Sequence, residues 1–312
     1  MKTILVTGCA GFIGTNLVAK LLEDENNFII GIDNFSPYYD FTTKVENVSS
    51  NKNSRFVCST IDIRNEYLLR TRIFDVYKID AVVHLAAQAG VAYSIKNSQE
   101  VIDVNIKAFD ELIKLCGKYN VKQFIFASSS SVLGDHDGNY RQKSPYAVTK
   151  ATNELQAYMY STLYPDMQIT GLRLYTVYGN RMRPDLAISK FTKAILNDEE
   201  IEVYGDGTIS RDFTYIDDVV EAFIHVLNFK NLNVCKIFDI GNGKSTTINE
   251  LIEMIKDICG KPDYNKVSYK KGKSFDAKTT LADTNNAMEY FGFKCKVGLR
   301  EGLERYIKKD NH

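Results

Sequence analysis

The stretch Ile4-Leu5-Val6-Thr7-Gly8-Cys9-Ala10-Gly11-Phe12-Ile13-Gly14 decides the fold of this 312-residue chain. Its first four residues predict a short buried strand, and its three glycines predict a tight turn. Leu17, Val18, Leu21 and Leu22 then recur at helical spacing. A glycine-rich turn therefore joins a buried strand to an amphipathic helix.

A second apolar run, residues 28–32, follows this helix and ends at Asp33. The order strand, glycine turn, helix, strand and acid predicts the nucleotide-binding half of a Rossmann fold. The glycines admit a pyrophosphate to the helix N-terminus, and the acid accepts hydrogen bonds from the adenosine ribose. A carboxylate would repel a 2′-phosphate and Asn34 is not a cation, so NAD is favoured over NADP. The alternative is a glycine-rich turn without a ligand.

Strands continue to alternate with helices as far as residue 174. The predicted strands are 55–58, 81–85, 124–127 and 169–174, and the predicted helices are 65–76, 101–119 and 145–163. This alternation predicts an α/β fold, a Rossmann-type doubly wound parallel sheet with helices on both faces.

The pattern becomes irregular after residue 175, which predicts a smaller C-terminal substrate-binding α/β lobe. We expect residues 1–175, with about 212–240 crossing back, to form the NAD-binding domain, and residues 176–211 and 241–312 to form the lobe. In the lobe and the crossing segment we expect helices at 187–196, 219–227, 248–258 and near 299–308, strands at 201–204 and 236–240, and irregular chain at 265–278.

Polar and small residues lie where the predicted strands end, at Gly8, Asp33, Asp62, residues 86–88 and residues 128–131. Ligands of parallel sheets bind beyond the carboxyl ends of the strands, so these residues are expected to converge on one crevice.

Tyr146 and Lys150 are four residues apart, which places them on one face of a helix. A neighbouring cation favours the phenolate and is expected to lower the pKa of Tyr146. A polar loop before an ordinary amphipathic helix is the alternative interpretation.

Composition excludes several classes of partner. Lys+Arg and Asp+Glu are equal at 39 each, which favours neither nucleic acid nor an anionic membrane. No apolar run approaches the roughly 20 residues that span a bilayer, and the first residues have no signal-peptide layout. The scattered cysteines and histidines show no metal-ligand spacing. We therefore expect a cytoplasmic protein without a metal site.

Seven motifs, in this order along the chain, resemble the extended short-chain dehydrogenase/reductase family. They are Thr7-Gly8-x-x-Gly11-Phe12-Ile13-Gly14, Asp33-Asn34, Asp62-Ile63, His84-Leu85-Ala86-Ala87, Ser128–Ser131, Tyr146-x-x-x-Lys150 and Arg211-Asp212-Phe213. Within this family the chain is most similar to nucleotide-sugar 4-epimerases of the UDP-glucuronate branch. The branch similarity is carried by residues 33–40 with Lys44, residues 86–95, and residues 176–179 before Arg183-Pro184-Asp185.

The resemblance implies a role for each matching position. NAD would contact Gly8, Gly11, Phe12, Ile13, Gly14, Asp33, Asn34, Asp62, Ile63, Leu85, Ala86, Ala87, Gln88, Asn105, Tyr146 and Lys150. Tyr146 would be the acid/base, assisted by Lys150 and Ser129. The UDP-sugar would contact Ser129, Ser130, Ser131, Tyr146, Thr176, Lys190, Arg211 and Asp276. The family also implies a homodimer formed through residues 101–119 and 145–163.

The implied activity is NAD-dependent inversion at C4 of a UDP-sugar through a transient 4-keto intermediate, from UDP-glucuronate to UDP-galacturonate. Dehydratases and decarboxylases of the family carry acids where this chain has Ser130 and Ser131, and serine hydroxyls are poor bases. Epimerisation of UDP-glucose or UDP-N-acetylglucosamine is an alternative. So is a non-catalytic NAD-binding sensor, because fold does not fix function. Departures from the branch pattern are Ala92, Leu133, Lys190 and residues 273–276.

Overall fold

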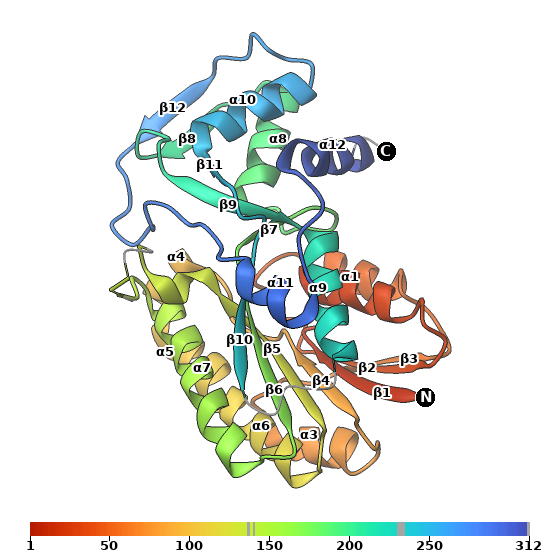
Figure 1. Ribbon diagram of the computed structural model, residues 1–312. Coiled ribbons are helices and arrows are strands. Elements are labelled where there is room, and N and C mark those ends of the chain that lie inside the picture. The colour runs from red at the N-terminus through yellow and green to blue at the C-terminus, as the bar shows by residue number, and fades with distance from the viewer. Residues whose placement is uncertain (136–137, 140, 230–234, 311–312) are drawn as a thin grey trace.

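The computed structural model describes residues 1–135, 138–139, 141–229 and 235–310 (Figure 1). A seven-stranded sheet has the order β10-β6-β5-β4-β1-β2-β3, and its neighbouring strands are all parallel. The strands are β1 (Lys2–Thr7), β2 (Asn27–Asp33), β3 (Phe56–Thr60), β4 (Ala81–His84), β5 (Gln123–Ser129), β6 (Gln168–Leu174) and β10 (Lys236–Ile240). Each predicted strand of this sheet is present, with its ends shifted by up to two residues.

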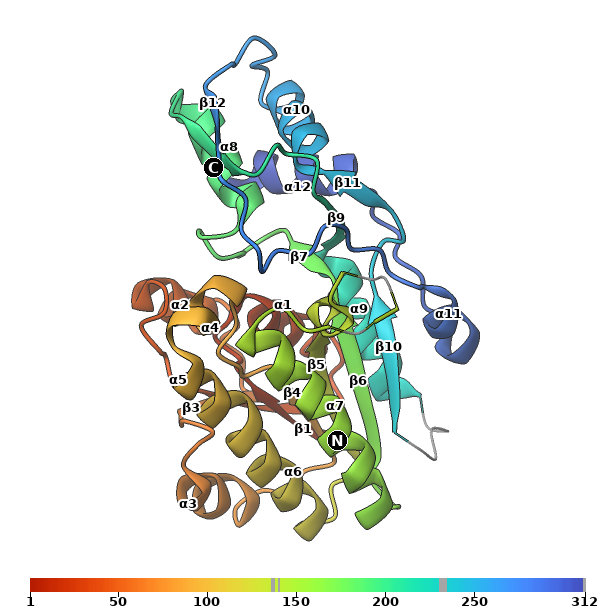
Figure 2. The same cartoon turned by 90° about the vertical axis from the view of Figure 1, so that its left-hand side faces the viewer.

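Helices cover both faces of the sheet, which confirms the predicted doubly wound α/β fold (Figure 1). On one face lie α1 (Phe12–Leu21) and α9 (Ile216–Asn228), and on the other lie α3 (Glu66–Leu69), α6 (Ala108–Lys118) and α7 (Pro145–Leu163). Shorter helices α2 (Phe41–Ser49) and α4 (Val91–Lys96) lie near the carboxyl ends of the strands (Figure 2), and α5 (Ser98–Ile102) follows α4 along the side of the sheet.

Two of the predicted helices contain a wide, π-helical turn. These turns are η1 (Arg70–Phe74) and η2 (Asp103–Lys107), and a 3-10 turn, η3 (Ser130–Leu133), follows β5. A single wide turn hardly changes hydrophobic periodicity, so the sequence pattern does not reveal it. Such turns are frequent at functional sites, and η2 carries the buried Asn105.

The C-terminal part contains two small sheets (Figure 2). One has the order β11-β9-β7 and the other pairs β12 with β8. Their strands are β7 (Thr176–Tyr178), β8 (Ile201–Tyr204), β9 (Ser210–Tyr215), β11 (Ser245–Thr247) and β12 (Val267–Lys270). The helices around them are α8 (Ala187–Asn197), α10 (Ile248–Ile258), α11 (Asn285–Phe291) and α12 (Leu299–Asp310). The prediction of irregular chain at 265–278 was wrong for β12, because pairing with β8 orders four residues that are too few to stand out in the sequence pattern.

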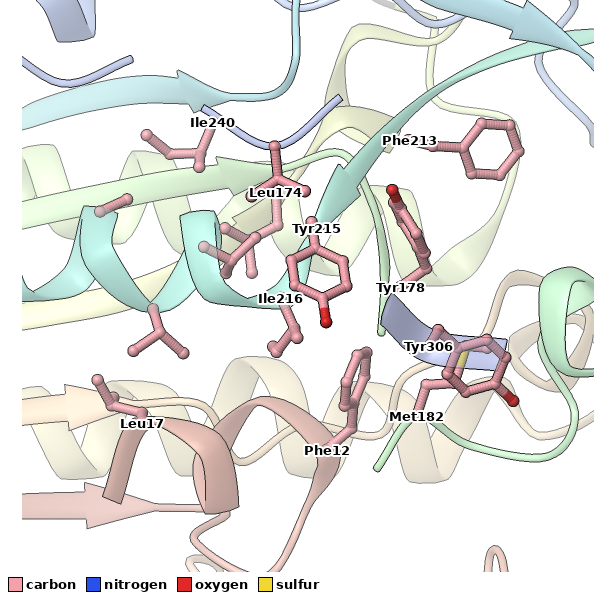
Figure 3. Packing of buried hydrophobic residues seen from close by; sticks show 14 of the residues in the cluster. Phe12, Leu17, Leu174, Tyr178, Met182, Phe213, Tyr215, Ile216, Ile240 and Tyr306 are labelled. Atoms are coloured by element: carbon pink, nitrogen blue, oxygen red, sulfur yellow. The ribbon is translucent and has the colours of Figure 1, made fainter. Parts of the chain in front are cut away.

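One hydrophobic cluster joins the large sheet to the C-terminal part. Figure 3 shows Phe12 of α1, Tyr215 of β9 and Tyr306 of α12 in the same packed layer. The Tyr178 hydroxyl donates a hydrogen bond to the Leu299 carbonyl at 3.1 Å. Gly302 makes room for this phenol, because a Cβ at residue 302 would lie 2.1 Å from its oxygen. The two sides of the crevice are therefore held by one continuous core.

Within the described ranges, no helix has the length and apolar character needed to cross a bilayer. The same residues contain no group of three His, Cys, Asp or Glu side chains that could hold a metal ion.

Candidate active site

The glycine turn after β1 depends on close backbone contacts. Gly8 has a φ of +71°, and a Cβ there would lie 2.8 Å from the Ala86 nitrogen. A Cβ on Gly14 would lie 2.1 Å from the Gly8 carbonyl oxygen. Side chains are excluded at both positions, so the turn packs directly on the first turn of α1. The N-terminal N–H groups of α1 are then directed at a cleft lined by Gly8, Gly11, Phe12, Ile13 and Gly14.

Two acids lie at the far end of this first cleft. Asp33 is buried at the end of β2 and accepts the Ala10 N–H at 3.2 Å. Asp62 follows β3 and accepts hydrogen bonds from the Arg64 and Asn34 side chains. These hydrogen bonds lower the pKa of Asp62 to about 2. Asn34 and Ile63 line the cleft beside them. Both acids thus present hydrogen-bond acceptors at the position expected for an adenosine.

The opposite end of the first cleft is formed after β4 by Leu85, Ala86, Ala87 and Gln88. Asn105 accepts the Gln88 N–H at 2.8 Å and donates to the Gln88 carbonyl and to Thr149. Asn105 is therefore a buried support for this wall. The Gln88 side-chain Nε2 is buried without a hydrogen-bond partner in the described chain. This orphaned donor and the Cβ-free turn fit a dinucleotide lying along the cleft.

Tyr146 meets Ser129 at the border of a second cleft. The helix that carries Tyr146 begins with a Ser144 cap and Pro145 in its first turn, both typical helix-start signals. Ser129, the last residue of β5, accepts the Ser131 hydroxyl at 2.9 Å and makes a hydrogen bond to Tyr146. Lys150, one turn further along α7, donates to the Ala127 carbonyl at 2.8 Å.

The expected lowering of the Tyr146 pKa by Lys150 was wrong for this state of the protein. Protein atoms around the hydroxyl desolvate the phenolate and raise the pKa of Tyr146, although the Ser129 hydrogen bond and the charge of Arg183 oppose the rise. Burial also lowers the pKa of Lys150 to about 8, against the opposing effect of Glu154. The Lys150 ammonium is directed at the Ala127 carbonyl, so it donates its hydrogen bond to the backbone of β5.

A buried ionic network supports this region from below. Glu154 accepts the Ser128 hydroxyl at 2.5 Å and two N–H groups of Arg173 at 2.9 and 2.8 Å. Arg173 also lies 3.6 Å from Asp239 of β10, and Asp239 accepts the Tyr175 hydroxyl at 2.7 Å. The network connects α7, β5, β6 and β10, so the strand ends that carry the site are fixed relative to one another.

The second cleft collects most of the residues predicted to bind substrate. Its lining includes Ser129, Ser130, Ser131, Tyr146, Thr176, Arg211 and Asp276. Residues with no predicted role also contribute, namely Lys143, which is paired with Asp135 at 2.6 Å, and Arg183. Arg183 lines both clefts, forms two 2.8 Å hydrogen bonds to Asp185 and lies over the Tyr38 ring.

The structure does not bring Lys190 into either cleft. It is exposed in the first turn of α8, because the apolar face of that helix turns it toward solvent. Lys273 packs its ammonium 3.6 Å from the centre of the Tyr204 ring. Of Lys190, Lys273 and Arg211, only Arg211 lines the second cleft. Lys143 lies in a polar loop whose sequence carries no local signal of function. Arg183 belongs to the Arg183-Pro184-Asp185 motif, but the resemblance assigned no role to it.

Comparisons with known proteins agree with this geometry. The sequence pattern of the NAD dependent epimerase/dehydratase family matches residues 4–241. The chain belongs to this family. NAD is accordingly its cofactor, as the sequence predicted, and the residues described above fit it.

Named relatives of this epimerase/dehydratase cover nearly the whole chain. A UDP-glucuronate 4-epimerase of Thermodesulfobacterium geofontis is 38% identical over 98% of this chain and 95% of its own. The crystal structure of a UDP-glucuronic acid 4-epimerase from Bacillus cereus, with UDP-glucuronic acid and NAD, has a TM-score of 0.91 at 34% identity and covers 99% of this chain and 100% of that chain. The crystal structure of the UDP-glucose 4-epimerase of Thermotoga maritima, with UDP-glucose, has a TM-score of 0.88 at 32% identity. It covers 99% of this chain and 98% of that chain.

The buried lysine predicts a pH-dependent stability. In cofactor-free protein, the free energy of unfolding of the wild type relative to Lys150→Met should rise by about 2 kcal/mol between pH 8 and 9.5. In this range the unfolded chain holds the Lys150 proton, while the folded chain, with a pKa of about 8, releases it. Stability rises with pH wherever the unfolded state binds more protons. Urea unfolding across this range measures the difference.

Lys52→Met is the control, because Lys52 is exposed and should follow the wild type at every pH. Parallel stability curves for wild type and Lys150→Met would show that the ammonium is not desolvated in the folded protein.

Proposed function

We propose that this enzyme inverts the configuration at C4 of a UDP-sugar and that its substrate is UDP-glucuronate. The single observation that carries the proposal is the contact of Tyr146 with Ser129 in the lining of the second cleft, with Lys150 one turn along the same helix. A phenol that can exchange a proton with a sugar hydroxyl lies beside a cofactor that exchanges hydride.

The chain's own residues would divide the binding of NAD between backbone and side chains. The glycine turn and the N-terminus of α1 would hold the pyrophosphate, Asp33 the adenosine ribose, and Gln88 the nicotinamide end. NAD supplies reversible acceptance of a hydride from C4. Tyr146 would take the O4 proton and return it, and Ser129 would donate a hydrogen bond that stabilises charge on the phenolate.

Several residues that line the second cleft are small. Gly90, Ser129, Ser130, Ser131 and Ala147 line the second cleft beside Tyr146. Small side chains leave space for a 4-keto sugar to rotate about its diphosphate linkage and present its other face. Return of hydride to that face gives the C4 epimer, with no net oxidation.

The charge of the second cleft supports an anionic substrate. Lys143, Arg183 and Arg211 contribute three cations to its lining, and Asp276 is the one acid that the described residues place there. Lys143 and Arg183 are each paired with a carboxylate, Asp135 and Asp185 respectively, so Arg211 carries most of this argument. Burial lowers the pKa of Arg211, which the charges of Asp276 and Asp135 partly offset. A desolvated guanidinium gains most by meeting a diphosphate.

The serines distinguish this proposal from dehydration or decarboxylation. Removal of the C5 proton needs a base, and Ser130 and Ser131 offer hydroxyls instead. We propose that these hydroxyls, with Thr176, hold the sugar carboxylate where cleavage of the C5–C6 bond is disfavoured. Epimerisation of a neutral UDP-hexose is the second candidate, favoured by the likeness to the UDP-glucose 4-epimerase structure and by the suitability of neutral hydroxyls for either sugar.

A substrate panel tests the proposed function. Purified protein is incubated separately with UDP-glucuronate, UDP-glucose and UDP-N-acetylglucosamine, and the C4 epimers are followed by NMR. We expect turnover of UDP-glucuronate and a loss of at least roughly 100-fold in Tyr146→Phe, the scale of general acid–base catalysis. Tyr67→Phe, at an exposed position on α3, is the control that should retain full activity.

Turnover of only the neutral sugars would replace UDP-glucuronate by the second candidate. Binding of NAD without turnover of any sugar would favour the non-catalytic sensor and contradict the proposal.

Substitution of both serines tests the placement of the carboxylate. Ser130→Ala, Ser131→Ala should release more UDP-4-keto-pentose and CO2 per turnover than the wild type, because the 4-keto uronate is a β-keto acid that the hydroxyls no longer hold. Mass spectrometry of the nucleotide products measures the ratio. Ser161→Ala on the outer surface of α7 should not change it, and an unchanged ratio in the double variant would refute the proposed contact.

We further propose that the protein is a homodimer, located in the cytoplasm, and that two copies pack through α7. The helix presents a stripe of exposed apolar side chains: Val148, Leu155, Tyr158, Met159 and Leu163. Leu155 is the most exposed of these five side chains, at 70%. A self-complementary apolar stripe is typical of two-fold interfaces.

Leu155→Glu, Leu163→Glu should convert the dimer to a monomer, because four buried carboxylates would meet at the interface. Sedimentation velocity measures the change. Tyr67→Glu, at a comparably exposed position on α3, should leave the wild-type species unaltered. A monomeric wild type, or a double variant that stays dimeric, would exclude α7 as the interface.

A further inference from the structure

Two cysteines meet beside the cofactor cleft. The Sγ atoms of Cys9, in the glycine turn, and Cys58, in β3, are 3.6 Å apart. Cys9 is buried, whereas Cys58 is partly accessible. The two residues come from either side of β2, so a particular feature of β2 must let their side chains touch.

That feature is Gly31. It pairs with Val6 of β1 on one side and with Cys58 of β3 on the other. A Cβ at residue 31 would lie 2.7 Å from the Cys9 sulfur and 2.8 Å from the Phe56 ring. The Cys9 sulfur thus occupies the space that any side chain at residue 31 would fill. This places it within reach of Cys58 across an intervening strand.

We propose that Cys9 and Cys58 form a reversible disulfide in the presence of a peroxide, and that this bond weakens NAD binding. The Cys58 sulfur attacks one peroxide oxygen, the O–O bond breaks, and a sulfenic acid and one water form. The Cys9 sulfur then attacks the Cys58 sulfur, and its proton leaves with the hydroxyl group as a second water. Two thiols lose two electrons and the peroxide gains two.

The chemistry of the two thiols assigns their order of reaction. The hydrogen bond from Cys9 lowers the pKa of Cys58 against the effect of burial, whereas the same contact and burial raise the pKa of Cys9. Thiolates are the nucleophiles of cysteine oxidation. Cys58, which is also the more accessible of the two, reacts first, and Cys9 is the resolving thiol.

A disulfide would disturb the cofactor cleft because both cysteines belong to chain segments that line this cleft further along. Bond formation shortens the 3.6 Å contact to roughly 2.05 Å. On one side, Cys9 lies in the glycine turn, and its neighbour Ala10 donates the 3.2 Å hydrogen bond to Asp33. On the other side, β3 is an edge strand that leads to Asp62. Movement on either side displaces a group that lines the NAD cleft.

Thiol mapping and cofactor binding test the inference together, without a sugar substrate and therefore independently of the proposed activity. The full-length protein is treated with hydrogen peroxide, alkylated, digested and analysed by mass spectrometry, and NAD affinity is measured by calorimetry. We expect a peptide pair linked through Cys9 and Cys58. We also expect the Kd for NAD to rise roughly tenfold, as for loss of one hydrogen bond to a charged group, and dithiothreitol to reverse it.

Cys58→Ser should bind NAD with the same Kd as the reduced wild type, and this Kd should not rise after treatment with peroxide. Cys259→Ser, Cys295→Ser, which removes the other two partly accessible thiols, should respond as the wild type. The inference is overturned if no linked peptide forms, if the linked protein binds NAD normally, or if Cys58→Ser loses affinity equally after peroxide.

Discussion

The hydrogen bond from Lys150 to the Ala127 carbonyl is the contact on which the candidate site depends. It fixes α7 to the end of β5, and so holds Tyr146 of the helix against Ser129 of the strand. The bond requires an ammonium in a fully enclosed place, where burial lowers its pKa to about 8. Glu154 opposes this loss of charge, and Arg173 in turn holds Glu154 with two hydrogen bonds. A buried cation of this kind costs stability, and a catalytic position gives a reason for it that core packing does not.

The two clefts use different kinds of group. The first cleft is built largely from backbone: a glycine turn without room for side chains, a helix N-terminus, and a loop held by Asn105. The second cleft is lined by side chains from β5, β7, β9 and the loop near Asp276. Arg183 lines both, and the shared core around Tyr178 and Tyr215 prevents the two sides from shifting independently. This rigidity suits a reaction in which the sugar, and not the protein, must turn over between two half-reactions.

Most of the large sheet could be predicted from the sequence, because buried parallel strands are continuous apolar runs and their glycines and acids mark the carboxyl ends. The first cleft followed for the same reason, since its lining comes from strand ends in a fixed order. Contacts between distant loops could not be predicted. Lys190 was placed by motif alone and points to solvent, Arg183 reaches the clefts only through tertiary structure, and β12 is ordered by its partner strand. The expected effect of Lys150 on the pKa of Tyr146 failed because helical spacing gives proximity but not desolvation. The boundaries of the two predicted domains and the roles of individual site residues stay predictions.

The proposed reaction oxidises and then reduces C4 of the sugar while the sugar stays bound in the second cleft. To test it, UDP-glucuronate that carries deuterium at C4 is incubated with the enzyme in ordinary water, and the product is analysed by NMR. The epimer should retain deuterium at C4. Loss of the label to water would contradict the proposed hydride transfer, because it would require C4 to lose its hydrogen as a proton.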